Sequence, residues 1–215
     1  MGLKPYLVPA EEIRREQIVV NSRYIATLAP VFSVDEARAF IARIKAEFSD
    51  ASHNVPVYLV GHGDSVIAHC SDAGEPSGTA GRPALAVLQG SGLGDVAVVV
   101  TRYFGGTKLG TGGLVRAYGD AVRAVVEAVP RAEKVPVHLV MAAFPYTYLE
   151  PVRRLTRCNH GQVLDEQFAA DVTLTARFPV EHFLAFQDDL REMTRGSVQA
   201  VILESGEALV RLPDK

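Results

Sequence analysis

The chain has 215 residues, of which 48% are hydrophobic and 22% charged, a composition near the globular average that excludes a wholly disordered protein. Its length corresponds to one large domain or two small ones. The formal net charge is −3, and residues 1–134 hold 14 basic and 14 acidic residues, which excludes a strongly basic nucleic-acid-binding domain but not a local basic patch.

The first part of the chain predicts two strands, a helix and a hairpin. Residues 17–28 favour extended structure, interrupted by an Asn-Ser break. A helix is expected to begin at Ser33, because Ser33 and Glu36 have the spacing of a capping box and apolar residues follow at intervals of three and four. Residues 55–60 and 65–70 predict two strands joined by a Gly-His-Gly-Asp turn.

The middle of the chain alternates loops, helices and one strongly apolar strand. Residues 71–82 form a loop rich in Gly, Pro, Ser and Thr, and residues 83–88 predict a short helix with proline as its first residue. Residues 96–103 are almost continuously apolar, which is typical of a strand covered on both faces. A glycine-rich loop at 105–113 then precedes a long helix at 114–129, which the next proline ends.

The last part of the chain predicts the order β-α-β-β-α-β after a linker-like boundary segment that contains Pro136. Either Thr147 and Glu150 cap the first helix or Pro151 is its first residue, and Gly196 is the expected stop of the second helix. The expected elements are strands at 138–144, 162–168, 171–178 and 198–204, and helices at 148–157 and 180–195.

The glycine-rich loop is the first candidate for a functional site. Its successive backbone N–H groups could face an anion, and the N-terminus of the following helix adds positive potential. Arg102, Lys108 and Arg116 flank the loop. The known nucleotide fingerprints do not match, since no Gly-x-x-x-x-Gly-Lys-Ser/Thr occurs and the Gly-x-Gly-x-x-Gly pattern from Gly110 fails at Val115. A tight turn packed against neighbouring backbone is the alternative interpretation.

Two carboxylates precede this loop in the sequence. Asp72 and Glu75 could bind a metal with His69 or take part in acid–base catalysis. No third metal ligand is evident from spacing, so we favour a structural ion pair with Arg102 or a loop-capping role. The hydroxyl of Thr79 is expected to cap the helix that follows. No catalytic residue and no metal site is predicted.

Two aromatic residues, Tyr103 and Phe104, directly follow Arg102. An aromatic and basic cluster at the end of a strand can stack on nucleic-acid bases, as in single-stranded nucleic-acid binders. The alternative is that one of the rings anchors the core.

The sequence carries no targeting or membrane signal. No apolar stretch approaches the ~20 residues of a membrane helix, and the N-terminus lacks the apolar core of a signal peptide. The two cysteines, Cys70 and Cys158, form no C-x-x-C pair. We therefore expect a reduced, cytoplasmic protein without a membrane partner and without a cofactor.

Two segments resemble the YigZ/IMPACT family. They are SDAGEPSGTAGRP at residues 71–83 and VVVTRYFGGTKLGTGGLVRAYGDA at residues 98–121. The resemblance covers about residues 15–130, and the remainder looks like the small domain that bacterial members add. Two positions depart from the family pattern. Ala73 replaces the second Asp of the acidic loop, and Val55 stands where the family usually has Cys, which argues against a cysteine-based active site.

The resemblance implies an α+β protein of two domains. The N-terminal domain, at 1–134, would be similar to the α/β domain shared by a small-subunit ribosomal protein and domain four of elongation factor G. The C-terminal domain, at 135–215, would be ferredoxin-like, as in domain five of that factor. A fold does not fix a function, and the oligomeric state is left open.

The resemblance also implies a non-enzymatic regulatory protein associated with translation. Such a protein would bind RNA, the ribosome or a protein partner through the glycine-rich basic loop. The alternative is an enzyme or nucleotide-binding protein that holds phosphate at the same loop and magnesium at one of the two carboxylates. The candidate ligand-binding residues are Asp72, Glu75, Thr79, Arg102, Tyr103, Phe104, Gly105, Gly106, Lys108, Gly110, Gly112, Gly113, Arg116 and Tyr118.

Overall fold

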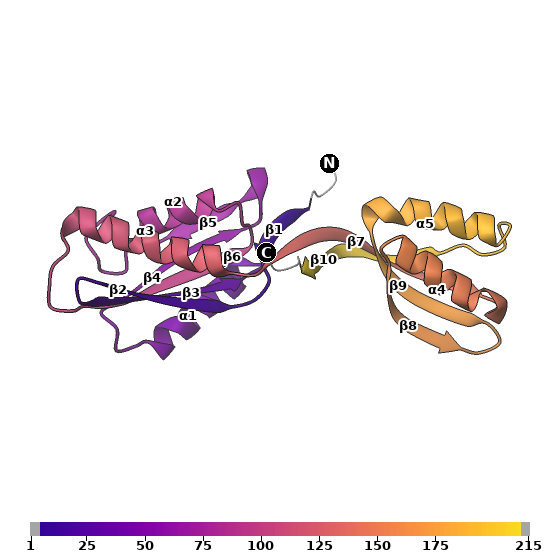
Figure 1. Cartoon of the computed structure of the whole chain (residues 1–215), viewed down its shortest axis with the longest axis horizontal. Coiled ribbons are helices and arrows are strands. Elements are labelled where there is room, and N and C mark those ends of the chain that lie inside the picture. Colours follow the sequence, from indigo (N-terminus) through magenta and orange to yellow (C-terminus); the bar gives the residue numbers. More distant parts are fainter. Residues whose placement is uncertain (1–4, 212–215) are drawn as a thin grey trace. The chain divides into compact units, whose positions relative to one another are not determined.

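The computed structural model describes residues 5–211, with Asp64 and Arg211 described through their backbone alone. It contains two compact units, Tyr6–Glu133 and Lys134–Val210, and each is described by itself. Both units combine helices with a sheet, so the expected α+β class is confirmed for this part of the chain (Figure 1). No helix among these residues is both long and apolar enough to span a membrane.

An antiparallel sheet in the order β2-β3-β6-β4-β5 forms the centre of the N-terminal unit. Its predicted strands are present, but the strand expected at 65–70 begins only at Ile67, after a short 3-10 turn, and the first strand begins at Ile13 rather than residue 17. Strand β1 (Tyr6–Pro9) precedes them. The central strand β6 is covered on both faces as predicted, because Val98 and Val100 face one core while Ala97 and Val99 face another. The sheet strands are β2 (Ile13–Val19), β3 (Ser22–Pro30), β4 (His53–Val60), β5 (Ile67–Cys70) and β6 (Val96–Tyr103).

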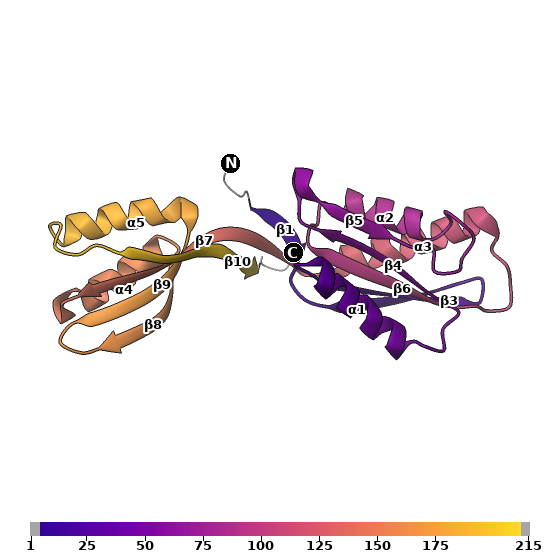
Figure 2. The same ribbon diagram turned by 180° about the vertical axis from the view of Figure 1, so that it is seen from behind.

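Three helices cover this sheet. The helices α2 (Gly81–Gly90) and α3 (Gly110–Ala128) lie on one face, and α1 (Val34–Glu47) lies on the other (Figures 1 and 2). The predicted start of α1 is confirmed, since the Glu36 N–H donates to Ser33 Oγ at 3.1 Å. The Glu36 carboxylate accepts from the Phe32 N–H, one residue earlier than a capping box requires.

Two helix starts differ from the prediction. Helix α2 begins at Gly81 rather than residue 83, because the side chain of Asp72 already binds backbone N–H groups before the proline. Helix α3 begins at Gly110 rather than residue 114, so three glycines assigned to the loop lie in its first turn. The glycine-rich loop is therefore shorter than predicted.

The expected linker around Pro136 is wrong. Strand β7 runs continuously over Arg131–Phe144, and its paired region with β9 starts at Val137. Because Pro136 precedes that paired region, its missing N–H removes no hydrogen bond from the β7–β9 ladder.

The C-terminal unit has the predicted order β-α-β-β-α-β. After β7 come α4 (Leu149–Cys158), β8 (Gln162–Phe168), β9 (Val172–Pro179), α5 (Val180–Met193) and β10 (Val201–Arg211). In the sheet, β9 lies between β7 and β8, and β10 also pairs with β7. Alternate residues such as Leu174 and Phe178 on β9 pack beneath the helices with Phe186 of α5.

The helix ends of this unit differ from the predictions. Neither expected start of α4 occurs, because Tyr148 precedes it without a side-chain cap and Pro151 is its third residue. At the end of α5, Arg195 already has a left-handed backbone (φ +53), and Gly196 follows it. The Gly196 N–H donates to Arg191 O at 2.8 Å, as in a Schellman motif. Strand β10 begins at residue 201 rather than 198.

Candidate functional site

Asp72 organises the loop before α2. One carboxylate oxygen accepts the N–H of Gly78 at 2.8 Å, and the other accepts those of Ala80 at 3.1 Å and Gly81 at 2.8 Å. The favoured loop-capping role of Asp72 is thus confirmed. The expected cap, Thr79, is wrong, because its hydroxyl donates to Pro76 O at 2.7 Å and points back into the loop.

These donors make the carboxyl of Asp72 a pH-sensitive contact. Partial burial opposes its ionisation, but the three backbone N–H groups outweigh burial and lower its pKa. A pKa that is lower in the folded than in the unfolded state stabilises the fold above the unfolded value, and the stability is lost as the pH falls through the folded value.

We therefore expect Asp72→Asn to destabilise the N-terminal unit at neutral pH by about 2 kcal/mol, since hydrogen bonds to a charged group are lost. The difference between the variant and the parent protein should shrink as the pH falls below the ordinary pKa of an aspartate. Chemical denaturation followed by circular dichroism across acidic pH measures both. A constant difference at every pH would contradict the role assigned to the carboxylate.

A buried polar cluster joins the acidic loop to β6 and α3. Arg102 Nη1 donates to Glu75 Oε1 at 2.6 Å, and the Tyr118 hydroxyl donates to the same oxygen at 2.7 Å. Only 3% of the Glu75 side chain and 6% of the Arg102 side chain are exposed. His53 Nε2 lies 3.8 Å from the other carboxylate oxygen. The favoured ion pair between Glu75 and Arg102 is confirmed.

Tyrosines complete the cluster. Burial and the hydrogen bond to Glu75 raise the pKa of Tyr118, so its hydroxyl stays a proton donor. Burial also raises the pKa of Tyr24 to about 12, and the two rings meet edge to face at 5.3 Å. The Tyr24 hydroxyl and Arg102 Nε are buried without a hydrogen-bond partner in the described chain.

The ion pair changes the expected role of Arg102. Its guanidinium lies inside the unit, so the expectation that it faces a phosphate is wrong. Tyr118 is fully buried and also faces inward. Tyr103 donates to Asp50 at 2.8 Å, whereas the ring of Phe104 is 48% exposed. Of the two aromatic residues, Phe104 is therefore the one open to solvent.

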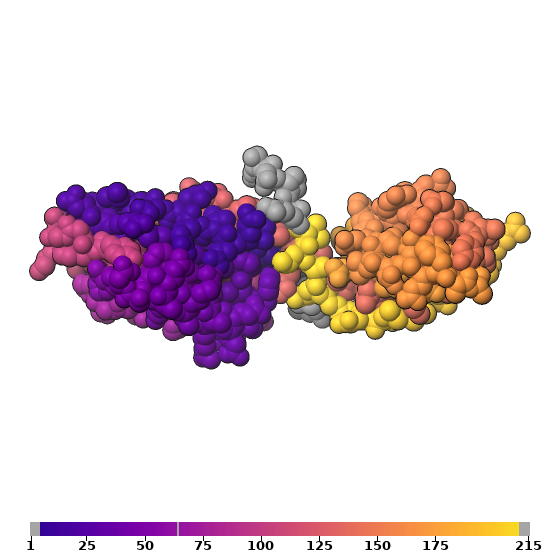
Figure 3. Space-filling view, turned by 90° about the horizontal axis from the view of Figure 1, so that it is seen from below, coloured from indigo at the N-terminus to yellow at the C-terminus, as the bar shows by residue number. Residues whose placement is uncertain are grey.

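The segment between β6 and α3 lies at the surface, at one end of the N-terminal unit (Figure 3). Its start is fixed, because the N–H groups of Phe104 and Gly105 donate to Ser52 Oγ at 3.0 Å and Ser22 Oγ at 3.2 Å. Gly105 packs directly on the backbone of Asn21, where no side chain would fit. The expectation of a glycine packed against neighbouring backbone is confirmed at this residue.

Beyond Gly105 the segment is open. Gly106 and Lys108 are exposed, and helix α3 begins without a side-chain cap, so its first N–H groups face solvent. Arg116 is exposed on the second turn of α3, and neither it nor Lys108 pairs with another described residue. Gly110, Gly112 and Gly113 place no side chain over these N–H groups.

The structure adds residues that sequence reasoning missed. Ser22, Ser52 and Tyr24 support the cluster and the glycine segment from distant positions in the chain. No local pattern marks them, because their partners lie 50 or more residues away. Among the described residues, no group of three His, Cys, Asp or Glu side chains could hold a metal ion.

The fold and the site define a class of protein with two α+β units. In its N-terminal unit, hydrogen bonds and a buried ion pair hold the acidic loop, and the glycine-rich start of α3 is exposed to solvent. A model of the Impact N-terminal domain matches residues 20–126, and a domain of unknown function (DUF1949) matches residues 143–197. The chain belongs to the IMPACT family.

Relatives match over nearly the whole chain. The IMPACT family member YigZ of Escherichia coli (strain K12) is 35% identical over 203 residues, which cover 94% of this chain and 100% of that protein. An IMPACT family member of Haemophilus influenzae is 38% identical over 94% of this chain and 98% of its own length. A crystal structure of a hypothetical protein superposes with a TM-score of 0.64 at 35% identity, covering 94% and 99% of the two chains.

Proposed function

We propose that this protein is a non-enzymatic, translation-associated regulator whose N-terminal unit binds RNA through the phosphate backbone. The observation that carries the proposal is the uncapped start of α3, where exposed N–H groups lie beside the unpaired cations of Lys108 and Arg116. Membership of the IMPACT family supports a regulatory role in translation.

The arrangement suits a small electrostatic footprint. Two free cations and one helix start can neutralise a few phosphates, in keeping with a net charge of −3. The exposed ring of Phe104 could stack on one base beside them. We also propose that the N-terminal unit has the fold of the translation-factor domain and that the C-terminal unit is ferredoxin-like, as the resemblance implies.

The enzymatic alternative is less well supported by the same residues. Both oxygens of Asp72 already accept backbone N–H groups, and Glu75 is neutralised by Arg102. Neither carboxylate is free to bind a magnesium ion in this conformation, so the two residues expected to hold the metal do not support this alternative.

Replacing both free cations tests the proposal. We expect Lys108→Ala/Arg116→Ala to weaken binding to a labelled single-stranded RNA and to lower the slope of log K against log salt by about 1.4, since each phosphate contact contributes about 0.7. Fluorescence anisotropy at several salt concentrations measures the slope. Phe104→Ala should weaken RNA binding without changing the slope of log K against log salt, because base stacking carries no charge.

Arg38→Ala/Lys45→Ala on α1 is the matched control, since it removes two exposed cations from the opposite face of the sheet. An equal loss of slope in both double variants would contradict the assigned site. No salt-dependent binding by the parent protein would overturn the RNA proposal and direct the search to a protein partner.

A further inference from the structure

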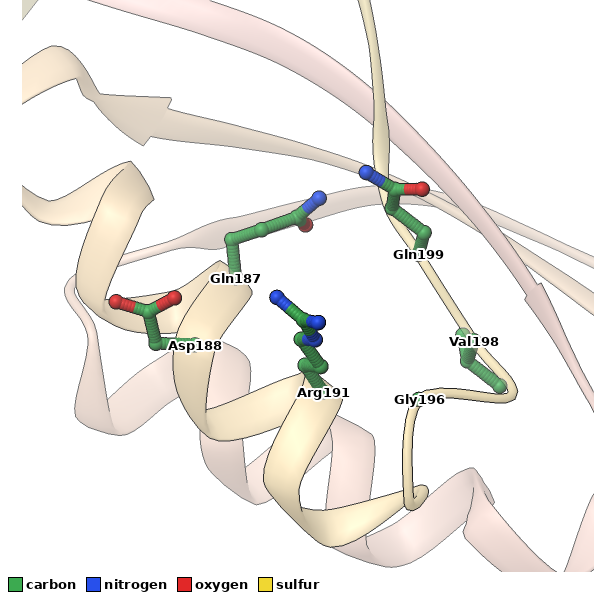
Figure 4. Close-up of a pocket in the computed structure, with 6 residues that line it drawn as sticks. All are labelled: Gln187, Asp188, Arg191, Gly196, Val198 and Gln199. Atoms are coloured by element: carbon green, nitrogen blue, oxygen red, sulfur yellow. The ribbon is translucent and has the colours of Figure 1, made fainter.

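The pocket between α5 and the segment that leads to β10 offers no convergent polar groups. Asp188, Arg191 and Gln199 line this space of about 330 Å³, but all three side chains are exposed, and the Asp188 carboxylate points away from Arg191 (Figure 4). The features that point to a ligand lie instead in the N-terminal unit, at the turn between β2 and β3.

This turn contains a strained valine. Val19 and Ser22 form the last pair of the β2–β3 ladder, so Val20 and Asn21 make the turn, and both have a left-handed backbone (φ +46 and +65). Two-residue turns of this kind favour Asn and Gly, which adopt a positive φ readily, whereas a β-branched residue rarely does. Within residues 5–211, Val20 is the only β-branched residue with a positive φ.

Burial does not explain the presence of valine. Val20 is 53% exposed, and Ile18, which precedes it on β2, is 72% exposed. An asparagine or a glycine would form the same turn without this strain. Because backbone strain of this kind clusters at ligand-binding sites, the valine indicates that an apolar side chain at this turn contacts a ligand.

The turn lies beside the glycine-rich segment. Gly105 packs on the backbone of Asn21, and the Gly105 N–H donates to Ser22 Oγ at 3.2 Å. The β2–β3 turn and the start of the segment are therefore in direct contact. Both ribbon views show them at the same end of the N-terminal unit (Figures 1 and 2).

Phe104 brings an oriented aromatic ring to this end of the unit. The guanidinium carbon of Arg102 lies over the ring, 5.4 Å from its centroid, and holds it from one side, while Phe104 remains 48% exposed. Lys108 lies in the same segment, and Arg116 lies on the second turn of α3. An aromatic ring and two cations thus accompany the exposed valine.

We infer that the RNA bound here carries an unpaired nucleotide whose base packs against Phe104 and Val20. This inference rests on the proposed RNA binding and adds what the RNA must present. The bases of a duplex are stacked and paired, whereas an unpaired base offers a π-face to the aromatic ring and apolar contact to the valine. Lys108 and Arg116 position the strand through its phosphates, and the contact with the base selects an unpaired strand.

Two RNAs of equal length test this selection. Contacts to phosphates alone favour a blunt-ended duplex, because its charge density is higher than that of a single strand. We expect the full-length protein to bind oligouridine more tightly than the duplex at the same salt concentration, as measured by fluorescence anisotropy. Equal or tighter binding of the duplex would overturn the inference and leave the phosphate-based function standing.

Val20→Asn separates the ligand contact from the fold. Asparagine suits the left-handed turn, so we expect the variant to unfold at a higher denaturant concentration than the parent protein. Binding of oligouridine should weaken about fivefold, since the base no longer buries the exposed half of a valine side chain. The slope of log K against log salt should stay that of the parent protein, because no charge changes. Increased stability with unchanged affinity for oligouridine would overturn the inference.

Val20→Ile and Leu184→Gln are the controls. The first keeps the β-branch and the apolar surface, so both stability and affinity should match those of the parent protein. The second removes an exposed apolar side chain from α5 and should leave oligouridine binding unchanged. Equal losses of affinity in Leu184→Gln and Val20→Asn would contradict the assigned contact.

The salt dependence distinguishes this inference from the proposed function. A salt slope that Lys108→Ala/Arg116→Ala lowers, together with no effect of Val20→Asn on affinity, would remove the unpaired-base contact and keep the phosphate contact. No salt-dependent binding of either RNA by the parent protein would overturn both.

Discussion

Replacement of Arg102 by Met is expected to destabilise the N-terminal unit by about 3–5 kcal/mol, the usual cost of leaving one partner of a buried ion pair alone. The Glu75 carboxylate would keep only the hydroxyl of Tyr118 as a close donor in an environment that excludes water. Chemical denaturation, with hydrogen exchange of the β6 amide protons to assign the loss to this unit, measures the effect.

A double variant and an exposed pair serve as controls. Glu75→Gln/Arg102→Met should recover part of the loss, because no uncompensated charge then remains inside. Arg23→Met, which breaks the exposed Arg23–Glu16 pair, should cost less than about 1 kcal/mol. Equal losses of unfolding free energy for Arg102→Met and Arg23→Met would show that burial does not increase the contribution of the Glu75–Arg102 pair to stability.

The buried cluster determines which charges can reach a partner. Glu75 belongs to the acidic loop, Arg102 to β6 and Tyr118 to α3, so one carboxylate ties together three segments distant in sequence. The ion pair neutralises Arg102, which precedes the glycine-rich segment in the sequence. The surface charge that remains there comes from Lys108 and Arg116. A charge count along the sequence alone would overestimate the basic character of this surface.

Elements with strong local signals were predictable from sequence. The valine-rich run of β6 and the Ser33 cap of α1 depend on periodicity and on one residue spacing, and both are present. The starts of α2 and α3 were not predictable. The first depends on Asp72, eight residues before Ala80. The second depends on glycines, of which Gly110 has a left-handed backbone (φ +71) and the others have low helix propensity.

The direction in which a site residue points was equally hidden from the sequence. Arg102 and Lys108 both flank a glycine-rich segment, yet one is buried and the other is exposed. The difference arises because Arg102 lies on β6 facing the acidic loop, and only the tertiary fold brings Glu75 to it. The sequence allows several partners for Glu75, and only this packing selects Arg102.

Gly105→Ala is expected to destabilise the N-terminal unit by about 3 kcal/mol, at the upper end of the cost of overpacking. A Cβ atom at this position would lie 2.0 Å from Asn21 O and 2.6 Å from Ser22 N, so backbone rather than a flexible side chain would have to move. The move would also break the hydrogen bond from the Gly105 N–H to Ser22 Oγ. Chemical denaturation measures the loss, and the RNA anisotropy assay should show weaker binding as Phe104 is displaced.

Gly112→Ala is the control within the same glycine-rich stretch. A Cβ atom there meets nothing within 4 Å, and the residue lies in the first turn of α3, where alanine is the better helix former. We expect this variant to be as stable as the parent protein or more stable by up to about 1 kcal/mol. If both alanine variants destabilise the unit equally, the glycines are needed for backbone conformation along the whole stretch. The close approach of Gly105 to the Asn21 turn would then not be what positions Phe104 and the start of α3.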